Sequence, residues 1–133
     1  MNDDIVGTRV VHRRYVPFSH AHYAGNLVDG AYGLGLFGDV ATELCITTDG
    51  DEGLFASYSE VQFRAPVRAG DCVEVTAEVV AAGNRSRTIE FRLTVVARSR
   101  PDRGPSAAEL LPEPVEATTA RGVVVVPPRR VAT

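Results

Sequence analysis

The sequence predicts an α+β domain in which about five antiparallel strands wrap around one long central helix. Apolar residues recur at the helical period of about 3.6 from residue 28 to 46, and at the strand period of about 2 after residue 53. The 133 residues suffice for one domain, 1–133, and are too few for two. No second helix is indicated that could cover the first, so the sheet itself has to wrap around it.

The elements follow from local patterns along the chain. Residues 7–15 read as a first strand, and the polar stretch 19–26 as a loop. The helix over 28–46 places one set of apolar residues on a shared face: Leu34, Phe37, Ala41, Leu44 and Cys45.

The second half of the chain alternates between strands and turns. Strands are predicted over 54–64, 72–81, 87–97 and 119–126, with a turn at 65–71 and a hairpin at Gly83-Asn84. Residues 100–117 hold four of the eight prolines and are predicted to form an extended loop. From residue 127 we expect a frayed tail.

All 14 basic residues are arginine, and the chain has no lysine. This excludes chemistry through a lysine Schiff base, and it excludes a P-loop. A net charge of −3 argues against nucleic acid as a partner. Cys45 and Cys72 read as buried thiols in a reducing compartment. With neither a signal peptide nor a membrane-spanning segment in the pattern, we expect a cytoplasmic protein.

The run Gly33-Leu34-Gly35-Leu36-Phe37-Gly38 fits the dinucleotide-binding pattern GxGxxG, but its context does not. That motif needs a preceding strand within a βαβ unit, whereas a polar loop precedes this one and antiparallel strands follow it. Each interior glycine costs a helix about 1 kcal/mol relative to alanine. Together with Gly30, the three glycines of this run give the helix four glycines. They predict that another part of the protein packs closely against the helix backbone, or that a ligand lies along the start of the helix.

Three segments resemble the hotdog fold of acyl-CoA enzymes: the lead-in 25–30, the turn 66–71 and the hairpin 83–87. More narrowly, the run from His22 to Leu44 and the acidic segment 49–55 resemble the 3-aminobutyryl-CoA ammonia-lyases. The resemblance covers about residues 8–98, and the proline-rich stretch departs from it. It implies elimination of ammonia from a 3-aminoacyl-CoA thioester, such as 3-aminobutyryl-CoA, to give a 2-enoyl-CoA.

This chemistry needs a base for the Cα proton and a donor for the enolate oxygen, together with a group for the leaving amine. Asp39 and Glu43 are the candidate catalytic carboxylates, because they share one helix face within an otherwise apolar run. Their pKa values are expected to separate, so that one is the base and the other holds ammonium. Alternatively, one of them is a solvated residue or pairs with arginine.

The start of the helix offers free N–H groups, and we expect Gly30 or Ala31 to donate to the enolate oxygen. His22 is a candidate catalytic residue beside Tyr23 and Asn26, which are candidate substrate contacts. Asp29 either caps the helix or binds the amine. The histidines at 20 and 12 are weaker candidates, and that at 12 is expected to be structural.

Coenzyme A carries phosphates, and in this chain only arginine can bind them. The hairpin residues Arg85, Ser86 and Arg87 are the first candidates, followed by Arg64 and Arg68. No metal is expected, because the three histidines form no HExxH motif and the cysteines form no ligand pair. No cofactor is expected either, since coenzyme A is part of the substrate. An open sheet edge and an uncovered helix start predict a homodimer, or a larger dimer-based assembly such as a hexamer, with sites at the dimer interface.

Two other functions fit the same residues. In an acyl-CoA thioesterase on this fold, Asp39 or Glu43 would activate water. In a non-catalytic module that holds an acyl thioester, both carboxylates would pair with arginine and the helix start would be occluded.

Overall fold

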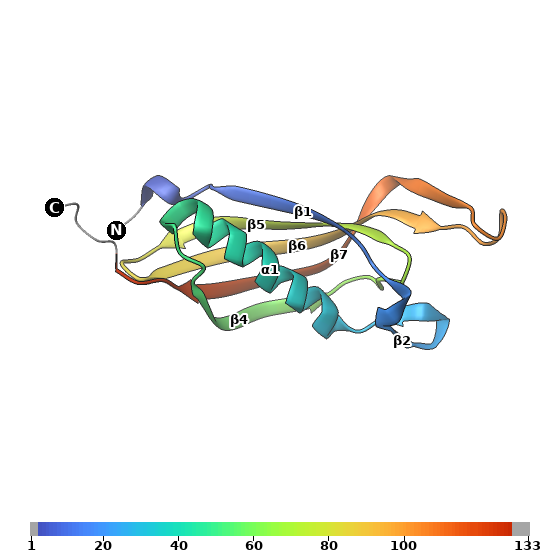
Figure 1. The fold of residues 1–133 in the computed structure, drawn as a ribbon, viewed down its shortest axis with the longest axis horizontal. Helices are drawn as coiled ribbons and strands as arrows, with labels where there is room; N and C mark the ends of the chain where they lie inside the picture. Colours follow the sequence, from blue (N-terminus) through green and yellow to red (C-terminus); the bar gives the residue numbers. More distant parts are fainter. Residues whose placement is uncertain (1–2, 129–133) are drawn as a thin grey trace.

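A computed structural model describes residues 3–128 of the chain. A five-stranded antiparallel sheet in the order β1-β5-β6-β7-β4 curves around helix α1, which crosses one of its faces (Figure 1). The predicted fold class is therefore confirmed. The helix and strand bounds are β1 Arg9–Tyr15, β2 Ala21–Tyr23, β3 Leu27–Val28, α1 Gly30–Asp49, β4 Leu54–Phe63, β5 Cys72–Ala82, β6 Ser86–Ser99 and β7 Ala108–Val125.

Helix α1 is capped at both ends by residues suited to those positions. Asp29 has extended backbone geometry, and its Oδ1 accepts a hydrogen bond from the Tyr32 N–H at 3.1 Å, as an N-cap aspartate does. Gly50 ends the helix in the left-handed conformation, with φ of 65°. The helix therefore begins two residues later than the apolar period predicts, and it ends three residues later.

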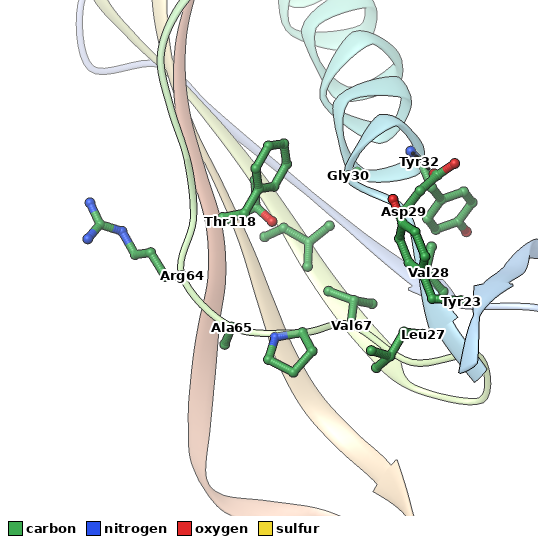
Figure 2. Close-up of a pocket in the computed structure, with 14 residues that line it drawn as sticks. Tyr23, Leu27, Val28, Asp29, Gly30, Tyr32, Arg64, Ala65, Val67 and Thr118 are labelled. Atoms are coloured by element: carbon green, nitrogen blue, oxygen red, sulfur yellow. Dashed lines mark hydrogen bonds between the residues drawn. The ribbon is translucent and has the colours of Figure 1, made fainter. Parts of the chain in front are cut away.

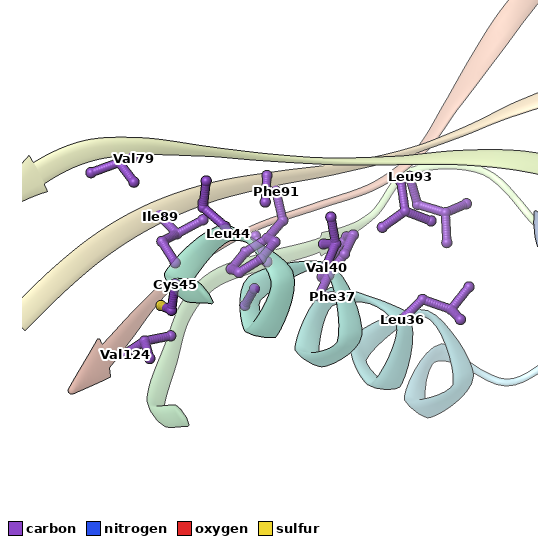
Figure 3. Close-up of a cluster of buried hydrophobic side chains, with 14 of the residues drawn as sticks. Leu36, Phe37, Val40, Leu44, Cys45, Val79, Ile89, Phe91, Leu93 and Val124 are labelled. Atoms are coloured by element: carbon purple, nitrogen blue, oxygen red, sulfur yellow. The ribbon is translucent and has the colours of Figure 1, made fainter. Parts of the chain in front are cut away.

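The core lies between the inner face of α1 and the concave face of the sheet (Figure 3). Phe37 of the helix stacks on Phe91 of β6, with ring centroids 4.9 Å apart. The alternation predicted for the two central strands is confirmed, because their inward residues are buried: Val73, Val75, Ala77 and Val79 in β5, and Ile89, Phe91, Leu93 and Val95 in β6.

The predicted loop over 100–117 is wrong for most of its length, because β7 already begins at Ala108. Strands β6 and β7 continue as a hairpin arm that projects beyond the rest of the sheet (Figure 1). Val95 pairs with Val115, and the next pair along the two strands is Ala97 with Leu110. Residues 111–114 of β7 therefore form a bulge opposite one residue of β6, Val96. Two prolines fall in this bulge, where a missing N–H removes no regular ladder bond.

Several smaller features complete the description. The polar stretch 19–26 contains 3-10 turns and the short strand β2, which pairs with β3. Residues 127–128 continue without regular structure, and the rest of the expected frayed tail lies outside the described residues. Over residues 3–128, no helix combines the length and apolar character needed to cross a membrane.

The two cysteines differ in exposure, so the expectation of two buried thiols holds for Cys45 and is wrong for Cys72, which is partly exposed. Burial, reinforced by the nearby Asp49 carboxylate, raises the pKa of Cys45 to about 11. Since the thiolate is the reactive form, we expect a thiol-disulfide reagent at pH 8 to label Cys72 in the folded protein well before Cys45. Mass spectrometry of the labelled peptides measures this, with urea-unfolded protein as the control in which both label at similar rates. Equal labelling rates in the folded protein would contradict it.

Candidate active site

A cavity of about 460 Å³ opens at the N-terminal end of α1, between the helix, the end of β4 and the segment that follows β4 (Figure 2). Its size lies within the range of small-molecule sites. Polar groups from the helix start face apolar side chains from the sheet across this space. The lining residues include Tyr23, Val28, Asp29, Gly30, Tyr32, Phe63, Arg64, Val67, Leu93 and Thr118.

The first turn of α1 supplies backbone donors at the edge of this cavity. Asp29 occupies the N–H of Tyr32, which leaves the N–H groups of Gly30 and Ala31 without a hydrogen-bond partner among the described residues. The helix dipole adds positive potential at the same point. Gly30 lines the cavity, whereas Ala31 is exposed beside it. The expected enolate-binding position is thus built from groups suited to an anion.

Gly30 is also required by the packing at this point. A Cβ atom placed there would lie 2.6 Å from Cζ of the Phe63 ring, too close for the ring to keep its position. Phe63 itself is 60% exposed and borders the cavity. The absent side chain therefore lets an aromatic ring lie directly over the start of the helix.

Polar side chains gather beside the cap of α1, where Asp29 and Tyr32 line the cavity. Asp29 Oδ2 lies 3.8 Å from His22 Nδ1, and the His22 ring contacts the ring of Tyr23 edge-on. Burial raises the pKa of Tyr32, the nearby charge of Arg14 opposes this rise, and the Asp39 carboxylate adds to it. Tyr32 therefore keeps its phenol proton at neutral pH and remains a hydrogen-bond donor.

The candidate carboxylates are exposed on α1, and Glu43 lies on the side of the helix that faces the edge strand β1. At about 1.5 Å per residue, Asp39 is about 14 Å and Glu43 about 20 Å along the helix from Gly30. One chain therefore does not bring either carboxylate to its own helix start. Neither pairs with an arginine among the described residues; Glu43 instead contacts His12.

The predicted coenzyme A residues divide into two groups. Arg64 borders the cavity and donates to Thr119 Oγ1 at 3.2 Å, while Arg68 follows the lining segment and is exposed. Arg85 and Ser86 lie at the β5–β6 hairpin, beside the opposite end of the helix (Figure 1). Helix α1 has 20 residues, which separates the two ends by about 30 Å.

Arg87 is not available to a phosphate, and this corrects the sequence prediction. Its side chain is 0% exposed and forms two hydrogen bonds to Asp49, at 2.6 and 3.0 Å. It also donates to the carbonyl oxygens of Gly83 and Ser86. Arg87 therefore joins the C-terminal end of α1 to the hairpin from inside the fold.

Some site residues differ from the prediction in other ways. Asn26 does not line the cavity; it has φ of 62°, and its carbonyl accepts from the Ala69 N–H. The prediction missed Tyr32, Phe63 and Thr118, which enter the cavity from separate elements. The alternation of burial along β1 places His12 on the same inward face as Val10. This pattern was the signal in the sequence that His12 faces the interior.

Within residues 3–128, no three His, Cys, Asp or Glu side chains gather to hold a metal ion.

Comparison with known proteins identifies the family of the chain. The family model described as the thioesterase superfamily matches residues 30–99. The 3-aminobutyryl-CoA ammonia lyase of Acetoanaerobium sticklandii is 51% identical over 107 residues, covering 80% of this chain and 85% of the relative. The chain belongs to the 3-aminobutyryl-CoA ammonia-lyase family. The family resemblance drawn from residues 22–44 is thereby confirmed.

Solved structures place this ammonia-lyase family member among hotdog proteins. The β-alanyl-CoA:ammonia lyase of Clostridium propionicum matches with a TM-score of 0.86 at 36% identity, covering 96% of this chain and 93% of that chain. A hexameric hotdog-fold thioesterase of Campylobacter jejuni matches with a TM-score of 0.71 at 22% identity, covering 89% and 82%. The second likeness extends to the fold alone.

Proposed function

We propose that the chain is a carbon–nitrogen lyase that eliminates ammonia from a 3-aminoacyl-CoA, such as 3-aminobutyryl-CoA, to give the 2-enoyl-CoA. The observation that carries this is the 51% identity to a 3-aminobutyryl-CoA ammonia lyase over most of both chains. The geometry supports it, because free helix donors open into a largely apolar cavity of substrate size.

The proposed reaction is a β-elimination through an enolate. A carboxylate takes the proton from Cα, and the electron pair of that C–H bond moves into the thioester as an enolate. The enolate then re-forms its carbonyl as the Cα–Cβ double bond forms. The Cβ–N bond breaks with its electron pair on nitrogen, and a substrate ammonium leaves as ammonia. The thioester itself acidifies Cα, so the proposal needs no cofactor.

We assign the residues by where each one lies. The N–H groups of Gly30 and Ala31 hold the enolate oxygen. Glu43, which a neighbouring side chain holds in place, is the base, and Asp39 holds the substrate ammonium. Asp29 caps the helix, while its second oxygen lies 3.8 Å from His22 Nδ1.

These roles require two copies of the chain. The carbonyl and Cα of a thioester are bonded neighbours, whereas Glu43 is about 20 Å along the helix from the donors of its own chain. A two-fold axis solves this by placing the carboxylate of one protomer at the helix start of the other. We therefore propose a homodimer, alone or within a hexamer, with each site shared between two subunits.

The exposed face of α1 suggests how the two helices meet. Gly35 and Gly38 have open space where a Cβ would stand, so another backbone can approach closely there. If the helices run antiparallel with Gly35 against the partner's Gly38, Gly30 falls opposite the partner's Glu43. The same arrangement brings the partner's β5–β6 hairpin near the cavity.

Coenzyme A would then be bound by both subunits. Arg64 stands at the cavity mouth, and the partner's Arg85 would approach from the hairpin side. The Arg85 side chain has no hydrogen-bond partner among the described residues, so its donors remain available to a phosphate. We also propose a cytoplasmic location, where Cys45 and Cys72 stay reduced.

An assay with 3-aminobutyryl-CoA and a thiol reagent tests the function directly. We expect the enoyl-thioester absorbance to rise and ammonia to be released in equal amounts, with no free coenzyme A. Butyryl-CoA is the control substrate, because it has no amine to eliminate. Release of free coenzyme A would instead indicate the thioesterase alternative, and binding without turnover would indicate a non-catalytic module.

A further inference from the structure

The side of α1 that carries Glu43 faces two polar residues on the inner face of the edge strand β1. His12 Nε2 lies 2.9 Å from Glu43 Oε1, and Arg14 Nη2 lies 3.2 Å from His12 Nδ1. Arg14 is itself anchored, because its Nη1 donates to the carbonyl oxygen of Arg13 at 3.0 Å. The His12 side chain is only 15% exposed, so its contacts are largely with the protein.

This arrangement determines where the imidazole proton lies. A guanidinium has only donors, so Nδ1 of His12 has to accept from Arg14 and carries no proton. The single proton of the neutral ring is therefore on Nε2, which donates it to Glu43 Oε1. A second proton on Nδ1 would point at the Arg14 donor.

We propose that Arg14 and His12 are positioning residues for Glu43, with Arg14 fixing the tautomer of His12 and His12 holding one carboxylate oxygen so that the other faces the substrate. The proposal rests on the proposed function, in which Glu43 is the base. With Nδ1 accepting from Arg14, Nε2 of His12 is the donor that orients the Glu43 carboxylate.

The other charged groups near this chain of contacts have separate places. Arg13 pairs with Glu74 of β5 on the other face of β1, at 2.6 Å. Asp39 and Tyr32 share the helix face with Glu43, and the charges of Asp39 and Arg14 both reach Tyr32. Arg13 is therefore a matched control for Arg14, since it is the same residue type on the same strand, directed away from Glu43.

Steady-state kinetics with 3-aminobutyryl-CoA test the role of His12. Groups that orient a functional side chain typically contribute about 10–100-fold. We expect His12→Leu to lower kcat by about that factor with KM nearly unchanged. His12→Gln, which keeps an N–H donor, should recover most of the loss, and Arg13→Gln should match the wild type. A His12→Leu enzyme with unchanged kcat would overturn the proposal.

Nuclear magnetic resonance of the imidazole tests Arg14. In the wild type, we expect the His12 ¹⁵N and ¹³C shifts to report the Nε2–H form. In Arg14→Met the Nδ1 atom loses its donor, so signals of the Nδ1–H tautomer should appear beside those of the Nε2–H form, and kcat should fall. A wild-type ring protonated on Nδ1 would overturn the proposal.

The two measurements separate failure of this inference from failure of the proposed function. A wild-type enzyme that releases no ammonia refutes the function, yet the imidazole spectrum still decides whether Arg14 sets the His12 tautomer. An active wild type, an inactive Glu43→Gln variant and a fully active His12→Leu variant would leave the function standing and refute the positioning role.

Discussion

Glu43→Gln is expected to lower kcat for ammonia elimination by about 10²–10⁴-fold, the range typical of losing a general base. The amide can still accept from His12 Nε2, and the side chain is exposed, so the fold should be unaffected. Asp39→Asn removes the proposed partner of the substrate ammonium. It should raise KM by about 10-fold, which corresponds to the loss of one charge-assisted hydrogen bond. Initial rates of enoyl-thioester formation measure both effects.

Glu52→Gln provides the control, because it removes an exposed carboxylate that follows the helix and takes no part in the proposed site. If Glu43→Gln retained wild-type kcat, Glu43 would not be the base.

The same variant tests whether the site is shared between subunits. Gly30→Val should also be inactive, because its side chain would collide with Phe63 over the helix donors. When the two inactive variants are unfolded together and refolded in equal amounts, about a quarter of wild-type activity should return, since half of the dimers are mixed and each keeps one intact site. A site contained within one chain would give no recovery.

The largest loss of stability is expected from breaking the Arg87–Asp49 pair. Arg87→Met removes the guanidinium that neutralises the buried Asp49 carboxylate, and breaking such a buried ion pair typically costs about 3–5 kcal/mol. For a chain of this length, that lowers Tm by roughly 10–20 °C. Calorimetry or urea unfolding measures the change.

A double variant and a surface variant make this measurement specific. Arg87→Met combined with Asp49→Leu should recover much of the loss, because an apolar pair carries no desolvation penalty. Arg103→Met removes a half-exposed arginine from a surface ion pair and should lower Tm far less than Arg87→Met does. A double variant as unstable as Arg87→Met would show that the charge of Asp49 is not the cause.

The sequence predicts those parts of the fold in which the pattern is local. The period-two alternation of β5 and β6, the helix and its Asp29 cap all follow from neighbouring residues, and all are found in the structure. The stretch 108–117 was missed because its prolines read as a break in pairing. A bulge opposite one residue of β6 lets the strand continue, and no local pattern reveals that partner.

The candidate site divides in the same way. Gly30, Asp29 and Tyr23 were predicted because they lead into the helix, whereas Phe63 and Thr118 arrive from strands far away in sequence. Arg87 was misassigned because an exposed and a buried arginine look alike in a sequence. Only the fold shows that Asp49, 38 residues earlier, lies against it.

The two ends of α1 are held with unequal strength. At its C-terminal end, Leu44 and Cys45 are buried and Arg87 ties Asp49 to the hairpin, whereas in the first turn Gly30 and Tyr32 are only partly buried and Ala31 is exposed. Local opening should therefore require less free energy at the first turn than at the last. Glu43 thus lies on the more firmly held half of the helix, whereas the cavity lies beside the half that opens more easily.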